Sequence, residues 1–389
     1  MAQCGLYLHV PFCSHKCGYC DFYSVPESAH DTGPLVDRLL DELRTRLNST
    51  HDPITTMFIG GGTPTVLSPD LLARLLEPLT PIAAQPPCIE FTIEANPGTL
   101  DDAKVRILAR SGVDRISLGA QSFQPGELAT LERGHRPDDV APAVEAARRA
   151  GIRRINLDLI FGIPGQTLTT WTDSIDRAIA LGVDHLALYG LTYEPGTPLT
   201  RRLEAGRIQR CPEQLEREMY LTAVRRAAAR GFEQYEISNF ARPDHRCRHN
   251  LLYWNNEPYI GVGPSAVGCI DGVRYRNVPD IERYVRMIDK SGSAVIETER
   301  VTGHRLAAEM VMLRLRLVEG IDAAEFEARA GWNPHTAFAG AIQRCRNLGL
   351  LRVTPTHIAL TDEGRLLADS IITEFMAELD EPASRPAPI

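Results

Sequence analysis

The chain carries near its amino end the stretch Leu6-Tyr-Leu-His-Val-Pro-Phe-Cys13-Ser-His-Lys-Cys17-Gly-Tyr-Cys20-Asp-Phe22. Its first five residues are mostly apolar and are bounded by Pro11, which predicts a short β-strand. Three cysteines then follow within eight residues, on the loop that leaves this strand. A strand that leads into a cysteine-rich loop is the first indication of both the fold and its chemistry.

An apolar run followed by an amphipathic segment recurs along the first half of the chain. The pattern predicts strands at residues 6–10, 55–59, 89–93, 115–118, 155–160 and 185–189, and helices at 33–47, from 68 onward, and at 101–111, 138–150 and 170–181. Such alternation with short turns builds an α/β fold, in which a parallel sheet is joined by crossover helices. Each strand is mostly apolar, as expected when both faces of a sheet are covered.

Residues with functional side chains lie where these strands end. They are Cys13, Gly61, Glu94, Gln121 and the pair Phe161-Gly162. Parallel α/β barrels bind ligands at the carboxyl ends of their strands, and open doubly wound sheets do the same. Position alone therefore predicts a ligand site at this edge and leaves the barrel and the open sheet as alternatives.

After about residue 277 the alternation gives way to a run of helices. Helices are predicted at 304–318, 322–330 and 334–347, two short strands at 350–354 and 357–360, and a last helix from 362 to about 379. Helices followed by a small hairpin are typical of a winged-helix-like α+β domain. The predicted organisation is a first domain over residues 1–300, a C-terminal domain over 301–379 and a proline-rich, disordered tail over 380–389.

Composition restricts the class of protein. The chain has 389 residues, 43% hydrophobic and 24% charged, with a net charge of −8, as in an ordinary globular protein. Proteins that bind nucleic acid usually present a basic face, so no nucleic-acid partner is expected. No apolar run approaches the roughly eighteen residues of a membrane span, and no signal peptide is evident at the amino end, so a cytoplasmic location is expected.

The clustered cysteines predict a metal centre. The chain has nine cysteines, and an odd number in a cytoplasmic protein argues against a disulfide framework. Soft thiolates select iron–sulfur clusters, zinc or copper(I). Four thiolates close a [4Fe-4S] cluster, so three would leave one iron open to a small ligand. The alternative is a zinc site with His9 or His15 as the fourth ligand.

The spacing Cys-x3-Cys-x2-Cys, with an aromatic residue before the last cysteine, resembles the hallmark loop of the radical S-adenosylmethionine superfamily. Five motifs are similar to its oxygen-independent coproporphyrinogen oxidase group: Tyr7-Leu-His-Val-Pro-Phe-Cys13, Gly60-Gly-Gly-Thr-Pro-Thr65, Glu94-Ala-Asn-Pro-Gly98, Gly119-Ala-Gln-Ser-Phe123 and Asn156-Leu-Asp-Leu-Ile-Phe-Gly-Ile-Pro-Gly165. The resemblance implies a partial TIM-type (βα)6 barrel, a [4Fe-4S] cluster on Cys13, Cys17 and Cys20, and S-adenosylmethionine as cofactor. It outweighs the zinc alternative.

By the same resemblance, residues near the strand ends hold S-adenosylmethionine. They are Tyr7, Tyr19, Gly61, Gly62, Thr63, Glu94, Gln121, Arg133 and Asp158. The glycines would let the backbone approach a ligand closely. Glu94 ends an apolar strand, where an unpaired carboxylate is costly. Gln121 can donate and accept hydrogen bonds and Arg133 can fork onto a carboxylate, although a structural role is the alternative for each of these two.

Two departures separate this chain from coproporphyrinogen oxidases. Those enzymes carry a fourth cysteine two residues after the third, and Phe22 stands at that position here. They also have a longer segment before the tyrosine that matches Tyr7, which six residues precede in this sequence. Both features resemble the heme chaperone family, HemW, of the same group. Coproporphyrinogen oxidase activity is therefore not expected.

A further segment, Cys247-Arg-His249-Asn-Leu-Leu-Tyr253-Trp254, resembles the heme-binding motif of that family. Imidazole is a common axial ligand of heme iron, and two aromatic side chains offer flat apolar surface to a porphyrin. We expect His249 to bind heme; the alternative is a histidine that closes a turn beside two core aromatics. Cys247 is either a second heme ligand or a buried structural cysteine.

The sequence thus predicts a heme chaperone on a radical S-adenosylmethionine fold. It would hold heme, with the cluster and the cofactor governing its state, and pass it to acceptor hemoproteins. A membrane hemoprotein as acceptor would bring the chaperone to the membrane surface. The competing hypothesis is an oxygen-independent coproporphyrinogen III dehydrogenase, which decarboxylates a porphyrinogen by radical chemistry. A radical enzyme acting on RNA is disfavoured by the acidic charge.

Overall fold

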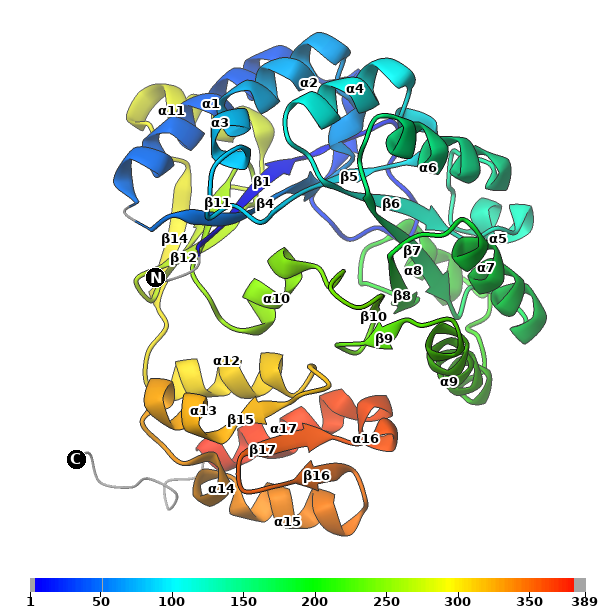
Figure 1. The fold of residues 1–389 in the computed structure, drawn as a ribbon, viewed down its shortest axis with the longest axis vertical. Helices are drawn as coiled ribbons and strands as arrows, with labels where there is room; N and C mark the ends of the chain where they lie inside the picture. Colours follow the sequence, from blue (N-terminus) through cyan, green and yellow to red (C-terminus); the bar gives the residue numbers. More distant parts are fainter. Residues whose placement is uncertain (1–3, 51, 381–389) are drawn as a thin grey trace.

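A computed structural model describes residues 4–50 and 52–380. Its main feature is a twelve-stranded sheet in the order β14 (Val295–Arg300), β13 (Val273–Asn277), β12 (Val267–Ile270), β11 (Tyr259–Val262), β1 (Cys4–Val10), β4 (Ile54–Gly61), β5 (Glu90–Ala95), β6 (Arg115–Gln121), β7 (Arg154–Phe161), β8 (His185–Gly190), β10 (Asn239–Ala241) and β9 (Glu233–Gln234). The strands from β1 to β8 in this order run parallel. They curve into an arc (Figure 1). The predicted α/β fold with a partial (βα)6 barrel is confirmed.

Helices follow the strands in sequence. They are α1 (Thr32–Ser49), α2 (Pro69–Leu76), α3 (Thr80–Ala83), α4 (Asp102–Arg110), α5 (Pro125–Thr130), α6 (Val140–Arg149), α7 (Leu168–Ala180), α8 (Pro198–Glu204) and α9 (Glu213–Ala229). Of these, α1, α2, α4, α6 and α7 cover the outside of the arc (Figure 1). Two starts agree with the sequence: Ser68 accepts a hydrogen bond from the Leu71 N–H and caps α2, and Asp101 caps α4. Two short strands, β2 (Phe12–Cys13) and β3 (Val25–Pro26), pair beside the barrel.

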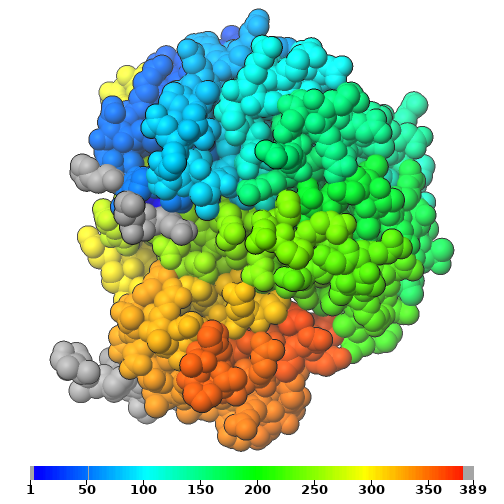
Figure 2. Space-filling view, viewed as in Figure 1, coloured from blue at the N-terminus to red at the C-terminus, as the bar shows by residue number. Residues whose placement is uncertain are grey.

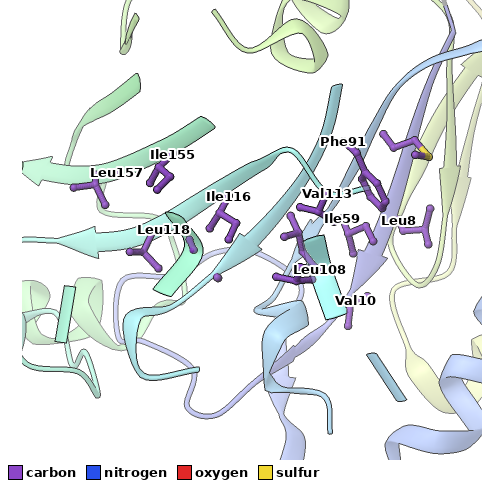
Figure 3. Close-up of a cluster of buried hydrophobic side chains, with 14 of the residues drawn as sticks. Leu8, Val10, Ile59, Phe91, Leu108, Val113, Ile116, Leu118, Ile155 and Leu157 are labelled. Atoms are coloured by element: carbon purple, nitrogen blue, oxygen red, sulfur yellow. The ribbon is translucent and has the colours of Figure 1, made fainter. Parts of the chain in front are cut away.

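The apolar core lies between the outer face of the sheet and these helices. Figure 3 shows part of it, with Leu8, Val10, Ile59, Phe91, Ile116, Leu118, Ile155 and Leu157 of the strands beside Leu108 and Val113. Each of these side chains is at most 4% exposed. Because successive side chains of a strand point to opposite faces, every second residue of each strand points into this core.

The strands are mostly apolar and buried, as expected, but the inner face of β5, β6 and β7 is polar, which the expectation did not specify. Where Phe91 and Ile93 face the helices, Thr92 and Glu94 face the inside of the barrel. Six polar side chains of β5, β6 and β7 line one internal cavity: Thr92, Glu94, Arg115, Ser117, Asn156 and Asp158. The interior of this barrel is thus a polar site and not a second apolar core.

The chain beyond β8, for which the sequence analysis predicted no elements up to residue 300, completes the barrel. α10 (Arg248–Trp254) lies at the open side of the arc, between the strands and the C-terminal domain (Figure 1). β11 then pairs with β1 in parallel, and β12, β13 and β14 extend the sheet in antiparallel fashion. α11 (Ile281–Ser291) packs against α1.

Glu42 of α1 fastens this late segment to the first helix. Its side chain is buried, and its carboxylate accepts hydrogen bonds from the Gly263 N–H at 2.9 Å and the Tyr284 hydroxyl at 2.7 Å. Asn277 Nδ2 donates to the same carboxylate at 2.9 Å, and Arg46 pairs with it at 3.1 Å. A buried carboxylate is costly unless it is paired, and these four partners supply that compensation.

The C-terminal region has its own apolar core. Its elements are α12 (His304–Arg314), β15 (Ile321–Asp322), α13 (Ala323–Ala330), α14 (Pro334–Ala337), α15 (Ala339–Asn347), β16 (Leu351–Val353), β17 (His357–Leu360), α16 (Asp362–Leu366) and α17 (Ala368–Asp380). The predicted hairpin forms, and β15 adds a third strand. The single helices predicted at 334–347 and from 362 are each divided in two, at Phe338 and Leu367. Of the predicted tail, 381–389 lies outside the described residues.

The C-terminal region packs directly against the barrel, as Figure 2 shows for the orange and green segments. Arg217 of α9 pairs with Glu363 of α16 at 2.9 Å, and Arg246 pairs with Glu319 at 2.7 Å. Across the described residues, no helix combines the length and the apolar character that crossing a bilayer requires.

Replacing Glu42 by alanine should lower the free energy of unfolding by about 2–4 kcal/mol, because it leaves buried donors without an acceptor. Glu42→Gln keeps one carbonyl acceptor and should cost less. Urea unfolding monitored by circular dichroism measures both. Equal midpoints for Glu42→Ala and the unchanged protein would contradict a structural role for this carboxylate.

Candidate functional site

The three cysteines of the amino-terminal motif lie on one loop beyond β1. Cys13 ends β2, and Cys17 and Cys20 follow in the turns after it. The Cys20 N–H donates to the Cys17 carbonyl at 3.1 Å, which holds the two residues in one turn. All three thiols are free, with Cys17 buried and the other two partly exposed. Burial raises the pKa of the Cys13 and Cys20 thiols.

A chain of hydrogen bonds joins two of these cysteines through residues that follow β4, β5 and β6. The Thr63 hydroxyl donates to Cys13 Sγ at 3.7 Å and accepts from Asn96 Nδ2 at 2.8 Å. Arg133 donates from Nη2 to Asn96 Oδ1 and, at 3.4 Å, from Nη1 to Cys17 Sγ. We call this the Thr63–Asn96–Arg133 bridge. It directs a neutral and a cationic donor at two sulfurs, which stabilises thiolate charge.

The arrangement fits an iron–sulfur cluster better than a single ion. A zinc ion needs four ligands that converge to within about 2.3 Å of one point. Within residues 4–50 and 52–380, no three His, Cys, Asp or Glu side chains are grouped closely enough to hold one ion. His9, considered as a zinc ligand, has Nδ1 3.0 Å from the Tyr7 hydroxyl and Nε2 2.8 Å from the Tyr23 carbonyl oxygen. A four-iron cluster is larger and accepts thiolates that lie further apart.

A cavity of about 470 Å³ lies inside the barrel and reaches the cysteine loop. Tyr19, Cys20 and Phe22 of that loop contribute to its lining, and Cys247 and Asn250 contribute from α10 and its start. Its size is in the range of small-molecule sites. The cavity therefore connects the cysteine loop to the segment that carries His249.

The cavity is acidic. Four carboxylates and one guanidinium line it: Asp21, Glu94, Asp158, Glu194 and Arg115. Arg115 is buried and already paired with the Glu90 carboxylate at 3.1 Å. A site with this charge balance favours a cationic ligand over an anionic one.

Two of the carboxylates titrate near neutral pH. Burial, together with the charge of Asp158, raises the pKa of Glu94 to about 8, although the Gly61 N–H donates to Glu94 at 3.0 Å and opposes the shift. Burial also raises the pKa of Asp158 to about 6, against hydrogen bonds from Asn156 and Ser117. A cationic ligand would favour the ionised forms and lower both pKa values.

Gln121 sits at a strained point of the backbone at the end of β6. Its φ is +62°, in the left-handed region that non-glycine residues seldom adopt, and the register with β7 shifts between Gly119 and Gln121. A Cβ on Gly119 would lie 2.9 Å from Gln121 Nε2. Such local strain is typical of functional sites, and here it turns the side chain into the lining of the cavity.

The glycine run after β4 is required by the chain itself. Gly61 has φ +96°, and a Cβ there would lie 2.3 Å from the His9 ring. A Cβ on Gly62 would lie 2.5 Å from the Phe12 carbonyl oxygen. The prediction was that these glycines let the backbone approach a ligand closely. In the structure, they let it approach β1 and the cysteine loop, and they hold that loop beside Thr63.

The buried Glu90 carboxylate fixes the start of α10. It accepts hydrogen bonds from the backbone N–H groups of Arg248 at 3.1 Å and His249 at 3.0 Å, and from Cys247 Sγ at 3.3 Å. An anion at a helix N-terminus is stabilised by the helix dipole. The Arg115 guanidinium is among the causes that lower the pKa of Glu90 against the effect of burial. α10 is thus tied to the base of β5 and β6.

His249 is enclosed in this structure. Its side chain is 0% exposed. Its Nδ1 lies 2.8 Å from the Thr56 hydroxyl and its Nε2 lies 2.9 Å from the Tyr253 hydroxyl. The ring stacks on Phe58 with centroids 5.3 Å apart. Burial lowers its pKa to about 4, so the imidazole is neutral at pH 7. Both ring nitrogens have hydrogen-bond partners in this conformation.

The two aromatic residues of the same motif line a second cavity, of about 310 Å³, together with Tyr189, Asn250 and Arg316. Tyr253 lies edge-on to Tyr259, with centroids 4.7 Å apart. The Trp254 Nε1 atom is buried and has no hydrogen-bond partner within the described part of the chain. Because Tyr189 and Asn250 also line the first cavity, the two cavities adjoin at α10.

The structure brings part of the predicted cofactor set together. Tyr19, Glu94, Gln121 and Asp158 line the first cavity, Thr63 and Arg133 contact the cysteines, Gly61 and Gly62 support the loop, and Tyr7 pairs with His9. Sequence reasoning assigned no role to Asn96 and Glu90. Asn96 stands inside the quoted Glu94–Gly98 motif, and Glu90 is a charge at the start of an apolar strand, so each left a signal.

Comparison with known proteins agrees with this architecture. The model of the Radical SAM superfamily matches residues 7–178, and that of the HemN C-terminal domain matches residues 301–367. The first match implies a [4Fe-4S] cluster and S-adenosylmethionine. Among solved structures, coproporphyrinogen III oxidase (HemN) from Escherichia coli superimposes with a TM-score of 0.82 at 22% identity, covering 96% of this chain and 90% of that one, and thus shares the fold.

Relatives of known name extend over nearly the whole chain. "Heme chaperone HemW" of Bacillus subtilis is 36% identical over 96% of this chain and 99% of its own length. "Heme chaperone HemW" of Escherichia coli is 34% identical, covering 96% and 98%. A zebrafish (Danio rerio) relative, "Radical S-adenosyl methionine domain-containing protein 1, mitochondrial", is 32% identical, covering 97% and 88%. The chain therefore belongs to the HemW family of the radical S-adenosylmethionine superfamily.

Proposed function

We propose that the protein is a heme chaperone, which binds heme and passes it to acceptor hemoproteins under the control of a cluster-bound S-adenosylmethionine. The observation that carries the proposal is the position of α10: its Asn250, Tyr253 and Trp254 lie where two cavities adjoin, one of which reaches the cysteine loop. His249, on the same helix, is buried behind them and contacts Tyr253. Relatives named heme chaperones at 36% and 34% identity support it. The proposed domains are residues 1–300 and 301–379.

The cluster is assigned to Cys13, Cys17 and Cys20. Three free thiols on one loop and the donors that reach two of them support this assignment. When bound, the cluster supplies one-electron chemistry and an open iron for the methionine end of the cofactor. The chain's own part is to hold the loop, through β2, the glycine run and the Thr63–Asn96–Arg133 bridge.

S-adenosylmethionine is assigned to the acidic cavity. Its sulfonium and ammonium groups are cations, and the carboxylates of Glu94 and Asp158 face the same space. Gln121, held in its strained conformation, offers a donor and an acceptor beside them. Tyr19 contributes an aromatic wall from the cysteine loop. Gly61, Gly62 and Thr63 would shape the space between the cavity and the cluster, with Tyr7 and Arg133 as supports.

Heme is assigned to α10, with His249 as the axial ligand. The low pKa of His249 favours this role, because the neutral imidazole is the form that binds iron. Ligation requires α10 to shift so that one ring nitrogen leaves Thr56 or Tyr253. Tyr253 and Trp254 supply flat surface, and Arg316 offers a cation to a propionate in the second cavity. The acidic first cavity would repel heme propionates.

Replacing His249 by alanine should abolish stoichiometric heme loading and leave the iron and sulfide of the cluster unchanged. Titration with hemin, followed by absorbance, and an iron and sulfide assay on the same anaerobic sample measure both. His15→Ala removes an exposed imidazole of the cysteine loop and serves as the matched control. Heme loading of His249→Ala at the level of the unchanged protein would refute the ligand assignment.

The competing activity is tested on the same preparation. Anaerobic incubation of the reconstituted protein with coproporphyrinogen III, S-adenosylmethionine and dithionite should give no protoporphyrinogen. Formation of that product at enzymatic rates would replace the chaperone proposal by the decarboxylase alternative.

Asn96→Ala should loosen the Thr63–Asn96–Arg133 bridge and weaken the cluster. Residues that hold metal ligands in place typically contribute about 10- to 100-fold to metal affinity, so iron should be lost to a chelator about tenfold faster. With fewer donors held on the sulfurs, the reduction potential of the cluster should fall. Thr99→Val, which removes the hydroxyl that caps the same turn but spares the bridge, is the control; equal effects of both variants would show that only the turn matters.

Binding of S-adenosylmethionine should strengthen as the pH rises through the pKa of Glu94, about 8. The cationic ligand favours the ionised carboxylate, so binding releases a proton below this pH and affinity levels off above it. Calorimetry in two buffers of different ionisation enthalpy measures the proton release. Glu94→Gln should bind about tenfold more weakly and lose most of this release. Proton release of equal size in the variant would contradict the role of Glu94.

A further inference from the structure

A basic segment lies next to the cysteine loop. It consists of α8 and the turn after it, residues 198–210, and contains four arginines and one acidic residue. The arginines are Arg201, Arg202, Arg207 and Arg210, and the acidic residue is Glu204. The segment is thus positive in a chain whose net charge is −8.

Three of these arginines are available at the surface. Arg201, Arg207 and Arg210 are exposed, and none of them forms an ion pair with a described residue. Arg210 lies over the ring of Tyr193, 4.5 Å from its centroid. The turn also borders a surface hollow of about 570 Å³, lined among others by Arg207 and Arg210.

The basic segment is attached to the cysteine loop by direct contacts. The Leu199 N–H, in the first turn of α8, donates to the Gly18 carbonyl at 2.8 Å, and Gly18 follows Cys17 in the chain. Arg202 pairs with Glu132 at 3.4 Å, and a Cβ on Gly18 would lie 2.9 Å from the Glu132 carboxyl carbon. One hydrogen bond therefore joins α8 to Gly18, the residue that follows Cys17.

The same region borders the mouth of the acidic cavity. Leu191, Thr192 and Glu194, in the segment that leads into α8, line that cavity together with Cys20 and Phe22. Phe22 is 69% exposed. The segment that leads into α8 thus lines the cavity beside the cysteine loop, and α8 itself contacts that loop at Gly18.

We propose that the basic segment is the docking surface for an acidic electron-transfer protein that reduces the cluster. The proposal rests on the cluster assignment above and is independent of heme. In the step it serves, the donor loses one electron and the cluster on the three cysteines gains it. No bond is made or broken, and no proton is transferred.

Electrostatics favours this partner over the other anionic surfaces. A net charge of −8 repels an acidic protein from most of the molecule, so a local positive face both attracts the donor and orients it. Insertion into a lipid surface usually adds apolar side chains to basic ones. Of the exposed large hydrophobic side chains of the described residues, none lies in 198–210, and one, Phe22, lies on the adjoining cysteine loop. A single apolar side chain is less than a surface that inserts into lipid usually offers. Because the segment contacts the cysteine loop, an electron donor bound there would lie close to the cluster. A lipid surface would gain nothing from that position.

Stopped-flow reduction of the reconstituted full-length protein tests the proposal, with reduced flavodoxin, a small acidic flavoprotein, as the donor. Arg201→Glu/Arg207→Glu should lower the second-order rate constant about tenfold at low ionic strength, and the difference should shrink as salt screens the charges. Reduction by dithionite should be unchanged, which shows that the cluster is intact. Arg346→Glu/Arg352→Glu, the same charge change on two exposed arginines of the C-terminal region, should behave as the unchanged protein.

Three outcomes would overturn the proposal. The first is an unchanged flavodoxin rate in the double variant. The second is an equal loss in both double variants, which would indicate net charge and not a docking face. The third is loss of sedimentation with anionic phosphatidylglycerol vesicles without loss of reduction, which would assign the segment to a membrane. Failure of dithionite reduction in the unchanged protein would instead refute the cluster assignment.

Discussion

The buried pair of Glu90 and Arg115 holds the interior of the barrel together. Removing two charges from water is costly, and a single ion pair seldom repays that cost unless the remaining lone pairs are satisfied. Here the Glu90 carboxylate also accepts three hydrogen bonds from residues 247–249, and Arg115 donates to the His245 carbonyl at 2.9 Å. Strands β5 and β6 therefore specify where α10 begins, and α10 in turn determines where His249 lies.

The polar inner face of the barrel has a related cause. An apolar outer face is enough to bind the helices, which leaves the inner face free to carry carboxylates, amides and hydroxyls around one cavity. Burial raises the pKa values of Glu94 and Asp158, and the charge of Asp158 raises that of Glu94 further. A cation that enters the cavity would favour the ionised carboxylates, so the site gains negative charge when such a ligand binds.

Much of this could be predicted from the sequence, and the limits have physical causes. The strand–helix alternation and the cysteine spacing are local patterns, so the six parallel strands β1, β4, β5, β6, β7 and β8 were predicted at the right places, and the cysteines were placed on the loop after β1. The two-residue strands β2 and β3 were not predicted. The polar lumen was missed because single polar residues inside apolar runs were treated as exceptions and not as one face. The Glu42 and Glu90 contacts join residues more than 150 positions apart in the sequence, and such pairings leave no local signal.

The enclosure of His249 has a consequence for kinetics. Both ring nitrogens are engaged and the ring stacks on Phe58, so on the proposed assignment heme iron would reach the imidazole only in a minority state in which α10 has moved and these contacts, here called the latch, are open. The capture rate would then rise with heme concentration only until latch opening becomes the slow step. Heme held at this site would leave through the same open state, so opening of the latch would limit release as well as capture.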